Sequence, residues 1–141
     1  MRKTNKKIVK TIGVVCFKED KVLLVKHGEA ARQPKGIYGL PSGHVEENEE
    51  LIEAAKREFN EETGLLAHVL TPLGHEFDPI QLTLKTGTFN FKWHVFICQK
   101  YSGELKANDE TEPEWVEIEK VRKLWVLPNI LKAIKVAKKK K

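Results

Sequence analysis

The chain contains 141 residues, of which 40% are hydrophobic and 32% are charged, and its formal net charge is +5. This length favours one domain (residues 1–141) with its own hydrophobic core, and the apolar content excludes a chain that is disordered throughout. No apolar run approaches the roughly 20 residues of a membrane-spanning helix, so we expect no membrane partner.

Strands and loops are expected before residue 46. Ile8–Phe17 and Lys21–Lys26 are apolar and rich in β-branched residues, and the charged Lys18–Asp20 between them predicts a hairpin. The polar segment His27–Gly36 contains proline and glycine, which predicts a loop. Tyr38–Val45 predicts a short extended piece broken by turns.

The clearest helix is expected from about Glu49 to Glu62. Asn48 suits its N-cap, because the side chain can accept hydrogen bonds from the first turn. Gly64 supplies the stop at the C-terminus. Apolar residues at spacings of three and four predict one buried stripe, formed by Leu51, Ile52, Ala55 and Phe59.

Strands and a second helix follow. Leu65–Phe77 and Gln81–Tyr101 are predicted strands, and a turn at residues 86–88 folds the second into a hairpin. Gly103–Glu114 predicts an acidic loop and Trp115–Glu119 a short strand. The last helix is expected over Asn129–Ala137, with one apolar side made of Ile130, Ile134 and Ala137.

The two cysteines and the N-terminal residues indicate in which cellular compartment the protein is expected. Cys16 and Cys98 lie in apolar runs, which excludes a disulfide scaffold and indicates buried thiols in a reducing compartment, with a redox pair as the alternative. The first residues are basic, but no cleavage site for a signal peptide follows. We therefore expect a cytoplasmic protein.

The basic residues gather at the ends of the chain. Residues 1–10 hold five cations and residues 130–141 hold six, with no acid in either segment. We expect the termini, at about 1–7 and 138–141, to be frayed and to aid solubility. Binding of nucleic acid through these lysines is the alternative.

A different pattern carries the chemistry: residues 46–62 hold eight glutamates against Lys56 and Arg57. Glu58, Glu61 and Glu62 are spaced so that a helix presents their carboxylates on one face. Oxygen ligands suit Mg²⁺ or Mn²⁺ and argue against zinc. Because Mg²⁺ is commonly shared with substrate phosphates, the pattern predicts a phosphorylated substrate. A solvated face rich in glutamate is the alternative.

This stretch resembles the Nudix box, Gly-x5-Glu-x7-Arg-Glu-U-x-Glu-Glu-x-Gly-U, in which U is a bulky apolar residue. All nine fixed positions are filled, by Gly43, Glu49, Arg57, Glu58, Phe59, Glu61, Glu62, Gly64 and Leu65. The likeness extends from about Ile8 to Trp115. It implies an α/β/α sandwich on a mixed sheet, with a catalytic loop–helix–loop, and a hydrolase acting on acid anhydrides of a nucleoside diphosphate linked to another group.

The resemblance also implies roles within the box. Glu58, Glu61 and Glu62 would bind the metal, and Glu58 or Glu61 would also serve in catalysis. Arg57 would orient the carboxylates by pairing with Glu49 or its neighbours. Phe59 would anchor the helix in the core, and the remaining structural positions would be Gly43, Glu49 and Gly64.

Two further ligands are implied outside the helix. Family members often have Pro-Gly-Gly before the box, with a backbone carbonyl that binds metal, whereas this chain has Ser42 in that place. A serine keeps the carbonyl but restricts the loop if φ must be positive. One more carboxylate, as ligand or base, would come from the second acidic cluster, with Glu110 as first choice and Glu112 as second.

The range of candidate substrates can be reduced only by elimination. The residues that mark Nudix subfamilies for ADP-ribose, dinucleoside polyphosphates or coenzyme A are not found at their usual places in this chain. Their absence favours a MutT-like enzyme. Such an enzyme would cleave a nucleoside triphosphate, common or oxidised, to monophosphate and pyrophosphate. Alternatives are an ADP-ribose or nucleoside-diphosphate-sugar pyrophosphatase and a non-catalytic RNA-binding or regulatory protein. The sequence is compatible with either a monomer or a homodimer. Candidates for substrate contact are Arg32, Lys35 and Tyr38, with Phe77, Trp93 and Trp115 as further stacking candidates.

Overall fold

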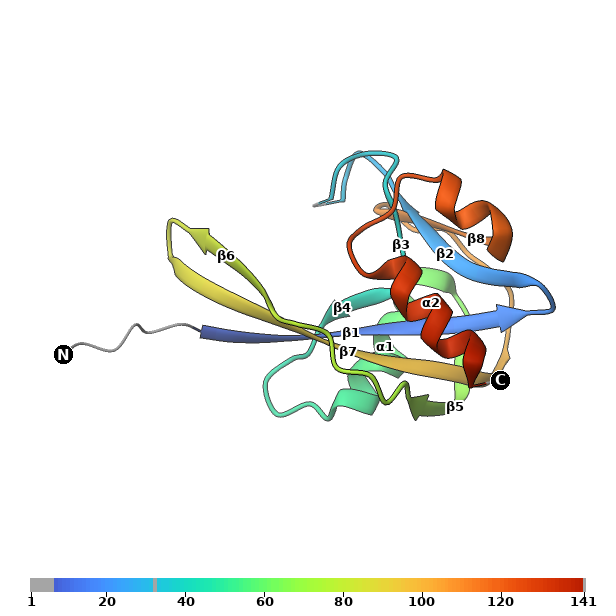
Figure 1. Ribbon diagram of the computed structural model, residues 1–141, viewed down its shortest axis with the longest axis horizontal. Helices are drawn as coiled ribbons and strands as arrows, with labels where there is room; N and C mark the ends of the chain where they lie inside the picture. Colours follow the sequence, from blue (N-terminus) through green and yellow to red (C-terminus); the bar gives the residue numbers. More distant parts are fainter. Residues whose placement is uncertain (1–6, 32, 141) are drawn as a thin grey trace.

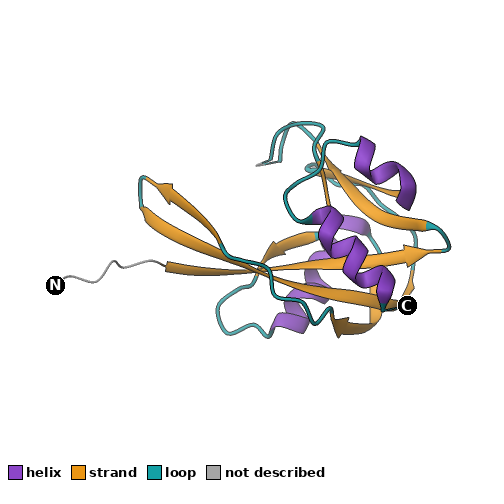
Figure 2. Cartoon of the chain, viewed as in Figure 1, coloured by secondary structure: helices purple, strands orange, loops and turns teal. Residues whose placement is uncertain are grey.

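The computed structural model describes residues 7–31 and 33–140. Its elements in chain order are β1 (Lys7–Lys18), β2 (Lys21–His27), β3 (Tyr38–Gly39), β4 (Ser42–His44), α1 (Leu51–Thr63), β5 (Leu66–Pro72), β6 (Ile80–Leu84), β7 (Gly87–Ser102), β8 (Thr111–Glu117), the 3₁₀ helix η1 (Ile118–Lys123) and α2 (Ile130–Lys139). Figure 1 follows them along the chain, and Figure 2 separates helices from strands. The two predicted hairpins are confirmed as β1–β2 and β6–β7.

The strands form one mixed sheet in the order β3-β2-β1-β7-β5, with β4 on β1, β6 on β7 and β8 on β2. The long pairing of β1 with β7 is parallel, and the pairs formed by the other strands are antiparallel. A parallel pair needs a long crossover, which here includes α1. No helix in the described segments is long and apolar enough to cross a membrane.

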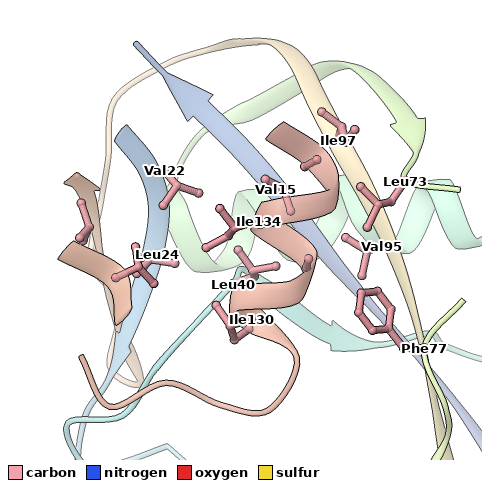
Figure 3. Close-up of a cluster of buried hydrophobic side chains, with 14 residues drawn as sticks. Val15, Val22, Leu24, Leu40, Leu73, Phe77, Val95, Ile97, Ile130 and Ile134 are labelled. Atoms are coloured by element: carbon pink, nitrogen blue, oxygen red, sulfur yellow. The ribbon is translucent and has the colours of Figure 1, made fainter. Parts of the chain in front are cut away.

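The sheet is covered by a helix on each face, because residues of β1 alternate between two cores. On one face Val14 and Cys16 pack with Phe59 of α1. On the other face Val15 packs with Ile134 of α2, in the cluster that Figure 3 shows. The α/β/α sandwich implied by the resemblance is therefore confirmed. Cys16 and Cys98 are buried, free thiols.

The start of α1 differs from the expectation. The helix begins at Leu51 rather than Glu49, and its N-cap is Glu50, which makes no capping hydrogen bond through its side chain. Asn48 is not the cap: its φ is +66°, the left-handed region of a turn. The reason is that Glu49 belongs to this turn, where its carboxylate accepts a hydrogen bond from the Glu46 N–H.

The buried stripe of α1 is also shifted. Ala54, Ala55, Phe59 and Thr63 are the buried residues of the helix, whereas Ile52 is 37% exposed. By periodicity Ile52, seven residues before Phe59, lies on the same side of the helix as Phe59, yet it belongs to the first turn and stays partly exposed, whereas Ala54 is buried. At its other end the helix stops at Gly64, which has a φ of +84° and donates its N–H to the Asn60 carbonyl.

Replacement of Phe59 by Ala is expected to lower the free energy of unfolding by about 3–5 kcal/mol, the usual range for a buried phenylalanine. Phe59 is fully buried between α1 and the sheet. Ile52→Ala in the same helix is the matched control and should cost much less, because Ile52 is partly exposed. Urea unfolding of both variants measures the difference, and equal losses would contradict this account of the core.

The C-terminal half departs from the expectation at two places. The strand predicted at Trp115–Glu119 begins at Thr111 instead and ends at Glu117, because it pairs with β2 from Lys21 to His27. Part of the acidic segment is therefore strand, not loop. At the chain ends, Lys7 belongs to β1, and Lys138 and Lys139 belong to the last turn of α2. Residues 1–6 and 141 lie outside the described residues.

Candidate active site

The carboxylate of Glu58 lies against the backbone of Gly43. A Cβ atom on Gly43 would overlap the Glu58 carboxylate, so the close approach needs glycine at this position. Gly43 is held in β4 opposite Ile12 of β1. The Glu58 side chain is 16% exposed, and burial raises the pKa of its carboxyl group.

Glu62 lies one turn further along α1 and reaches the same strand. Its Oε1 atom accepts a hydrogen bond of 2.8 Å from the Ser42 N–H. Burial is the main cause that raises the pKa of Glu62 to about 8, and the nearby charges of Glu58, Glu110 and Glu61 raise it further. The side chains of Glu58 and Glu62 thus both contact β4, and burial there disfavours their negative charge.

Ser42 fits this strand without backbone strain. It pairs with Gly13 of β1, and the described non-glycine residues with positive φ are Glu19, Asn48 and Asn129. The restriction expected from replacing glycine by serine therefore does not arise here.

Arg57 forms hydrogen bonds with three carboxylates, those of Glu49, Glu58 and Glu61. Its Nε and Nη2 atoms donate to the two oxygens of Glu49 at 2.9 and 3.0 Å. Its Nη1 atom donates to Glu58 at 2.8 Å and to Glu61 at 3.2 Å. The hydrogen bonds from Arg57 are the main cause that lowers the pKa of Glu49 to about 2. A bidentate pair of this kind fixes the guanidinium plane, and with it the position of the Glu58 carboxylate.

The acidic loop before β8 is tied to the end of α1 by Asn108. Its Oδ1 atom accepts from the backbone N–H groups of Glu110 at 2.7 Å and Thr111 at 2.8 Å, and its Nδ2 atom donates to the Glu61 carbonyl at 2.8 Å. This bridge brings Glu110 to the same cavity as Glu58 and Glu62. Sequence reasoning missed Asn108, because nothing in the local pattern marks a bridge across 47 residues.

The cavity has a volume of about 740 Å³ and lies across the sheet. Its acidic side is formed by Glu58 and Glu62 beside β4, with Glu110. In the register of the sheet, His44 of β4 lies opposite Thr11 of β1, which lies opposite Trp93 of β7. Two strand spacings, roughly 10 Å, therefore separate β4 from the aromatic wall. That wall is formed by Trp93 and Phe91, with Ile80 and Leu82 of β6.

Of the other sequence candidates, the structure brings few to the cavity. Glu61 is 54% exposed and pairs with Arg57 at its edge. Lys35 pairs with Glu29 at 2.8 Å, and the loop meets the cavity through Ala31 and Gln33 instead. Arg32 lies outside the described residues.

Tyr38, expected to contact substrate, lies elsewhere. It belongs to β3, packs at the margin of the core beneath α2 and donates its hydroxyl to Glu114 at 3.5 Å. Burial is the main cause that raises the pKa of the Tyr38 phenol, and the nearby charges of Glu114 and Glu112 raise it further. Glu112 therefore lies near Tyr38 and Glu114. Of the two acidic candidates, Glu110 and Glu112, only Glu110 lines the cavity.

Several lining residues were missed by sequence reasoning. Trp93 was a stacking candidate, but Phe91 was not, although the two are spaced by two residues in one strand and so share a face. Asn129 lines the cavity from the start of α2, and Asp78 lines it from the segment before β6. No motif marks these positions, since α2 and β6 reach the cavity only in the folded chain.

The carboxylate oxygens of Glu58, Glu62 and Glu110 fit a hard divalent cation. The cavity lining has no thiol, and its imidazoles are those of His27 and His44. Burial first, and then the nearby carboxylates, raise the pKa of Glu62, so a bound cation would stabilise its ionised form. In the arrangement described, Glu58 and Glu61 contact Arg57 while Glu62 contacts Ser42. Across residues 7–31 and 33–140, no three acidic, histidine or cysteine side chains are grouped as metal ligands would be.

A sandwich fold with this box between β4 and β5 is typical of hydrolases that act on phosphate compounds. Comparison with known proteins identifies the family. The model of the NUDIX domain matches residues 7–140. The chain therefore belongs to the Nudix family, and the resemblance noted in the sequence is confirmed.

Curated relatives match over part of their length. An ADP-ribose pyrophosphatase from Methanocaldococcus jannaschii is 36% identical over 113 residues, which are 76% of this chain and 60% of that protein. An oxidized purine nucleoside triphosphate hydrolase from Danio rerio is 33% identical over 79 residues, which are 56% of this chain and 48% of that protein. The chain thus spans less than two thirds of these relatives.

Solved structures share the fold. The MutT Nudix hydrolase from Burkholderia pseudomallei superposes with a TM-score of 0.74 at 22% identity, covering 92% of this chain and 98% of that one. The MutT protein from Methanosarcina mazei gives a TM-score of 0.72 at 24% identity, covering 99% of each chain.

Proposed function

We propose that this protein is a Mg²⁺-dependent pyrophosphohydrolase that cleaves a nucleoside triphosphate, common or oxidised, to the monophosphate and pyrophosphate. One observation carries the proposal: the half-buried carboxylates of Glu58 and Glu62 lie at one side of a cavity whose other wall is aromatic. A nucleoside needs an apolar surface for its base, whereas a phosphate chain needs cations. The cavity offers these two environments about two strand spacings apart.

At the acidic side, Glu58 and Glu62 would hold the metal, with Glu61 reaching it from the edge of the cavity and the Ser42 carbonyl as a further ligand. Mn²⁺ would serve as well, since the donors are all oxygens. When bound, a divalent ion neutralises charge on phosphate oxygens and lowers the pKa of a bound water. Arg57 acts as a positioning residue, because it does not line the cavity itself and its hydrogen bonds hold the cavity-lining Glu58 carboxylate and His44 carbonyl in place.

Glu110 is our candidate for the general base or a further ligand. It lines the cavity together with Glu58 and Glu62 of α1, and its backbone carbonyl accepts a hydrogen bond of 2.8 Å from the Gly28 N–H. Because that bond uses backbone atoms only, the carboxylate stays available to a water molecule in the cavity.

At the aromatic side, Phe91 and Trp93 would stack on the base. Asn129 and Asp78 offer an amide and a carboxylate to its edge. These two polar side chains support a substrate with a nucleobase, since an apolar wall alone would discriminate poorly between bases.

ADP-ribose is the second candidate substrate, favoured by the 36% identity to the ADP-ribose pyrophosphatase. The same acidic side would serve either substrate, because both contain a phosphoanhydride. Beyond the nucleoside, they differ in the group attached to the second phosphate, which is a phosphate in one and a ribose in the other.

The test is a hydrolysis assay with Mg²⁺, Mn²⁺ or EDTA, with products separated by ion-exchange chromatography. The panel contains the common nucleoside triphosphates, 8-oxo-dGTP, ADP-ribose and sugar nucleotides. We expect nucleoside monophosphate and pyrophosphate in equal amounts, and no turnover in EDTA. AMP with ribose 5-phosphate would establish the second substrate, and nucleoside diphosphate with orthophosphate would contradict the proposed bond.

A further inference from the structure

A three-stranded arm extends from the body of the molecule. It consists of residues 7–10 of β1, residues 80–84 of β6 and residues 87–91 of β7, and Figure 1 shows it projecting beyond the region that the helices cover. In this arm β7 is central, so β6 and β1 are the two edges. Neither helix packs over the arm, and its outer strand is accordingly exposed.

The β6 edge lacks the features that normally prevent strands from pairing between molecules. All five of its residues are exposed, and three are large apolar residues whose exposed fractions are 43% for Ile80, 47% for Leu82 and 51% for Leu84. The strand IQLTL contains no charge, proline or bulge. Natural proteins usually block such an edge with charged residues or proline.

The opposite edge of the same arm provides an internal comparison. There β1 carries Lys7 and Lys10, whose charges disfavour pairing with another copy, and the Lys10 carbonyl already accepts the Val45 N–H. Among the described residues, β6 has β7 as its strand partner and no other. The two edges of one ribbon therefore differ in the property that decides intermolecular pairing.

We propose that β6 pairs antiparallel with β6 of a second copy of this chain, around a two-fold axis at Leu82. A two-fold axis requires one surface to be complementary to itself, and β6 satisfies this requirement. With the axis at Leu82, Ile80 lies opposite Leu84 of the partner subunit, and the two Leu82 residues face each other.

This register suits the side chains on both faces. The three apolar residues have the same parity along the strand and lie on one face, whereas Gln81 and Thr83 pair on the other. At each end, Lys85 comes beside Pro79 of the partner subunit, next to Asp78, so no like charges meet. A shift by one residue would set apolar side chains against polar ones.

The pairing also reaches the catalytic cavity. Ile80 and Leu82 line the cavity, but Leu84 does not. In the dimer, Leu84 of the partner subunit lies beside Ile80, at the rim of the aromatic wall. Each subunit thus adds an apolar residue to the nucleoside side of the other, and the arms form one continuous six-stranded sheet.

A five-residue edge is smaller than a standard interface, which buries about 800 Å² of each partner. The dimer should therefore dissociate in the micromolar range and not be permanent. Sedimentation velocity over about 1–300 µM protein covers this range. The wild-type chain should shift from the monomer to the dimer sedimentation coefficient as concentration rises.

The register is tested by opposite charges at the axis. Leu82→Lys and Leu82→Glu should each remain monomeric, because like charges would face each other. An equimolar mixture of the two should dimerise, because opposite charges then meet. The corresponding mixture of Leu84→Lys and Leu84→Glu should not recover the dimer to the same extent, since residue 84 faces residue 80.

Ile8→Lys on the β1 edge is the matched control, and it should dimerise as the wild type does, since Ile8 is 67% exposed on the other side of the arm. Circular dichroism confirms that each variant is folded. A wild-type chain that stays monomeric at the highest concentration, or a Leu82→Lys variant that still dimerises, would overturn the proposal. These readouts do not depend on hydrolysis, so they stand apart from the proposed function.

Discussion

Replacement of Glu62 by Gln is expected to lower kcat by about 10²–10⁴, because the loss of a metal ligand removes several kcal/mol of transition-state stabilisation. Gln keeps the shape of the side chain and can still accept the hydrogen bond from the Ser42 N–H. The effect therefore reports the charge and not the packing. Steady-state hydrolysis at saturating Mg²⁺ measures it.

Glu53→Gln is the matched control, since it makes the same change on the exposed face of the same helix. It should leave kcat within about twofold of the wild type, as expected for a surface change that creates no cavity or unpaired charge. Full activity in Glu62→Gln would mean that this carboxylate does not hold the metal.

The same substitution should raise stability in the absence of metal. The pKa of Glu62 is about 8 in the folded chain against an ordinary 4.5, so the folded state binds the proton more tightly than the unfolded state does. Wild-type stability therefore falls as pH rises from 4.5 to 8, whereas Glu62→Gln is spared this loss. In EDTA the variant should melt a few degrees higher at pH 8, and the difference should shrink towards pH 5. A lower melting temperature at pH 8 would contradict this sign.

Gly43→Ala is expected to damage both activity and stability. The added Cβ would overlap the Glu58 carboxylate, and a displacement of about 1 Å at a catalytic group can cost 10²-fold in rate. Overpacking should also lower the free energy of unfolding by about 1–3 kcal/mol. Hydrolysis and urea unfolding measure the two losses.

Two variants separate crowding from a general effect of losing glycine. Gly28→Ala brings its Cβ no closer than 3.5 Å to the Glu110 carbonyl, an ordinary contact, so its stability should change by about 0.5 kcal/mol or less. In a Glu58→Ala background, Gly43→Ala should lose its stability cost, because the clashing carboxylate is gone. A cost that persists there would place the strain elsewhere.

Local sequence signals predicted most of the elements correctly. The β1–β2 and β6–β7 hairpins follow from apolar runs that flank a short turn, and the stop of α1 follows from Gly64. The wrong predictions fall where tertiary contacts compete with local preference. Asn48 is a good N-cap by type, but Glu49 in the same turn is drawn to Arg57, and the helix begins later. Thr111 to Glu114 look like loop, yet they pair with β2.

The family and the sandwich fold could be predicted from the chain alone, together with the helical part of the acidic side. The carboxylates of Glu58, Glu61 and Glu62 lie within the 23 positions from Gly43 to Leu65, and helix periodicity is enough to predict their common face. The rest of the cavity depends on the folded chain, because its lining comes from β1, β6, β7 and the start of α2. The tertiary structure likewise set Tyr38 against Glu114 and Glu110 beside Glu62, since these contacts depend on how β3, β8 and α1 assemble around one sheet.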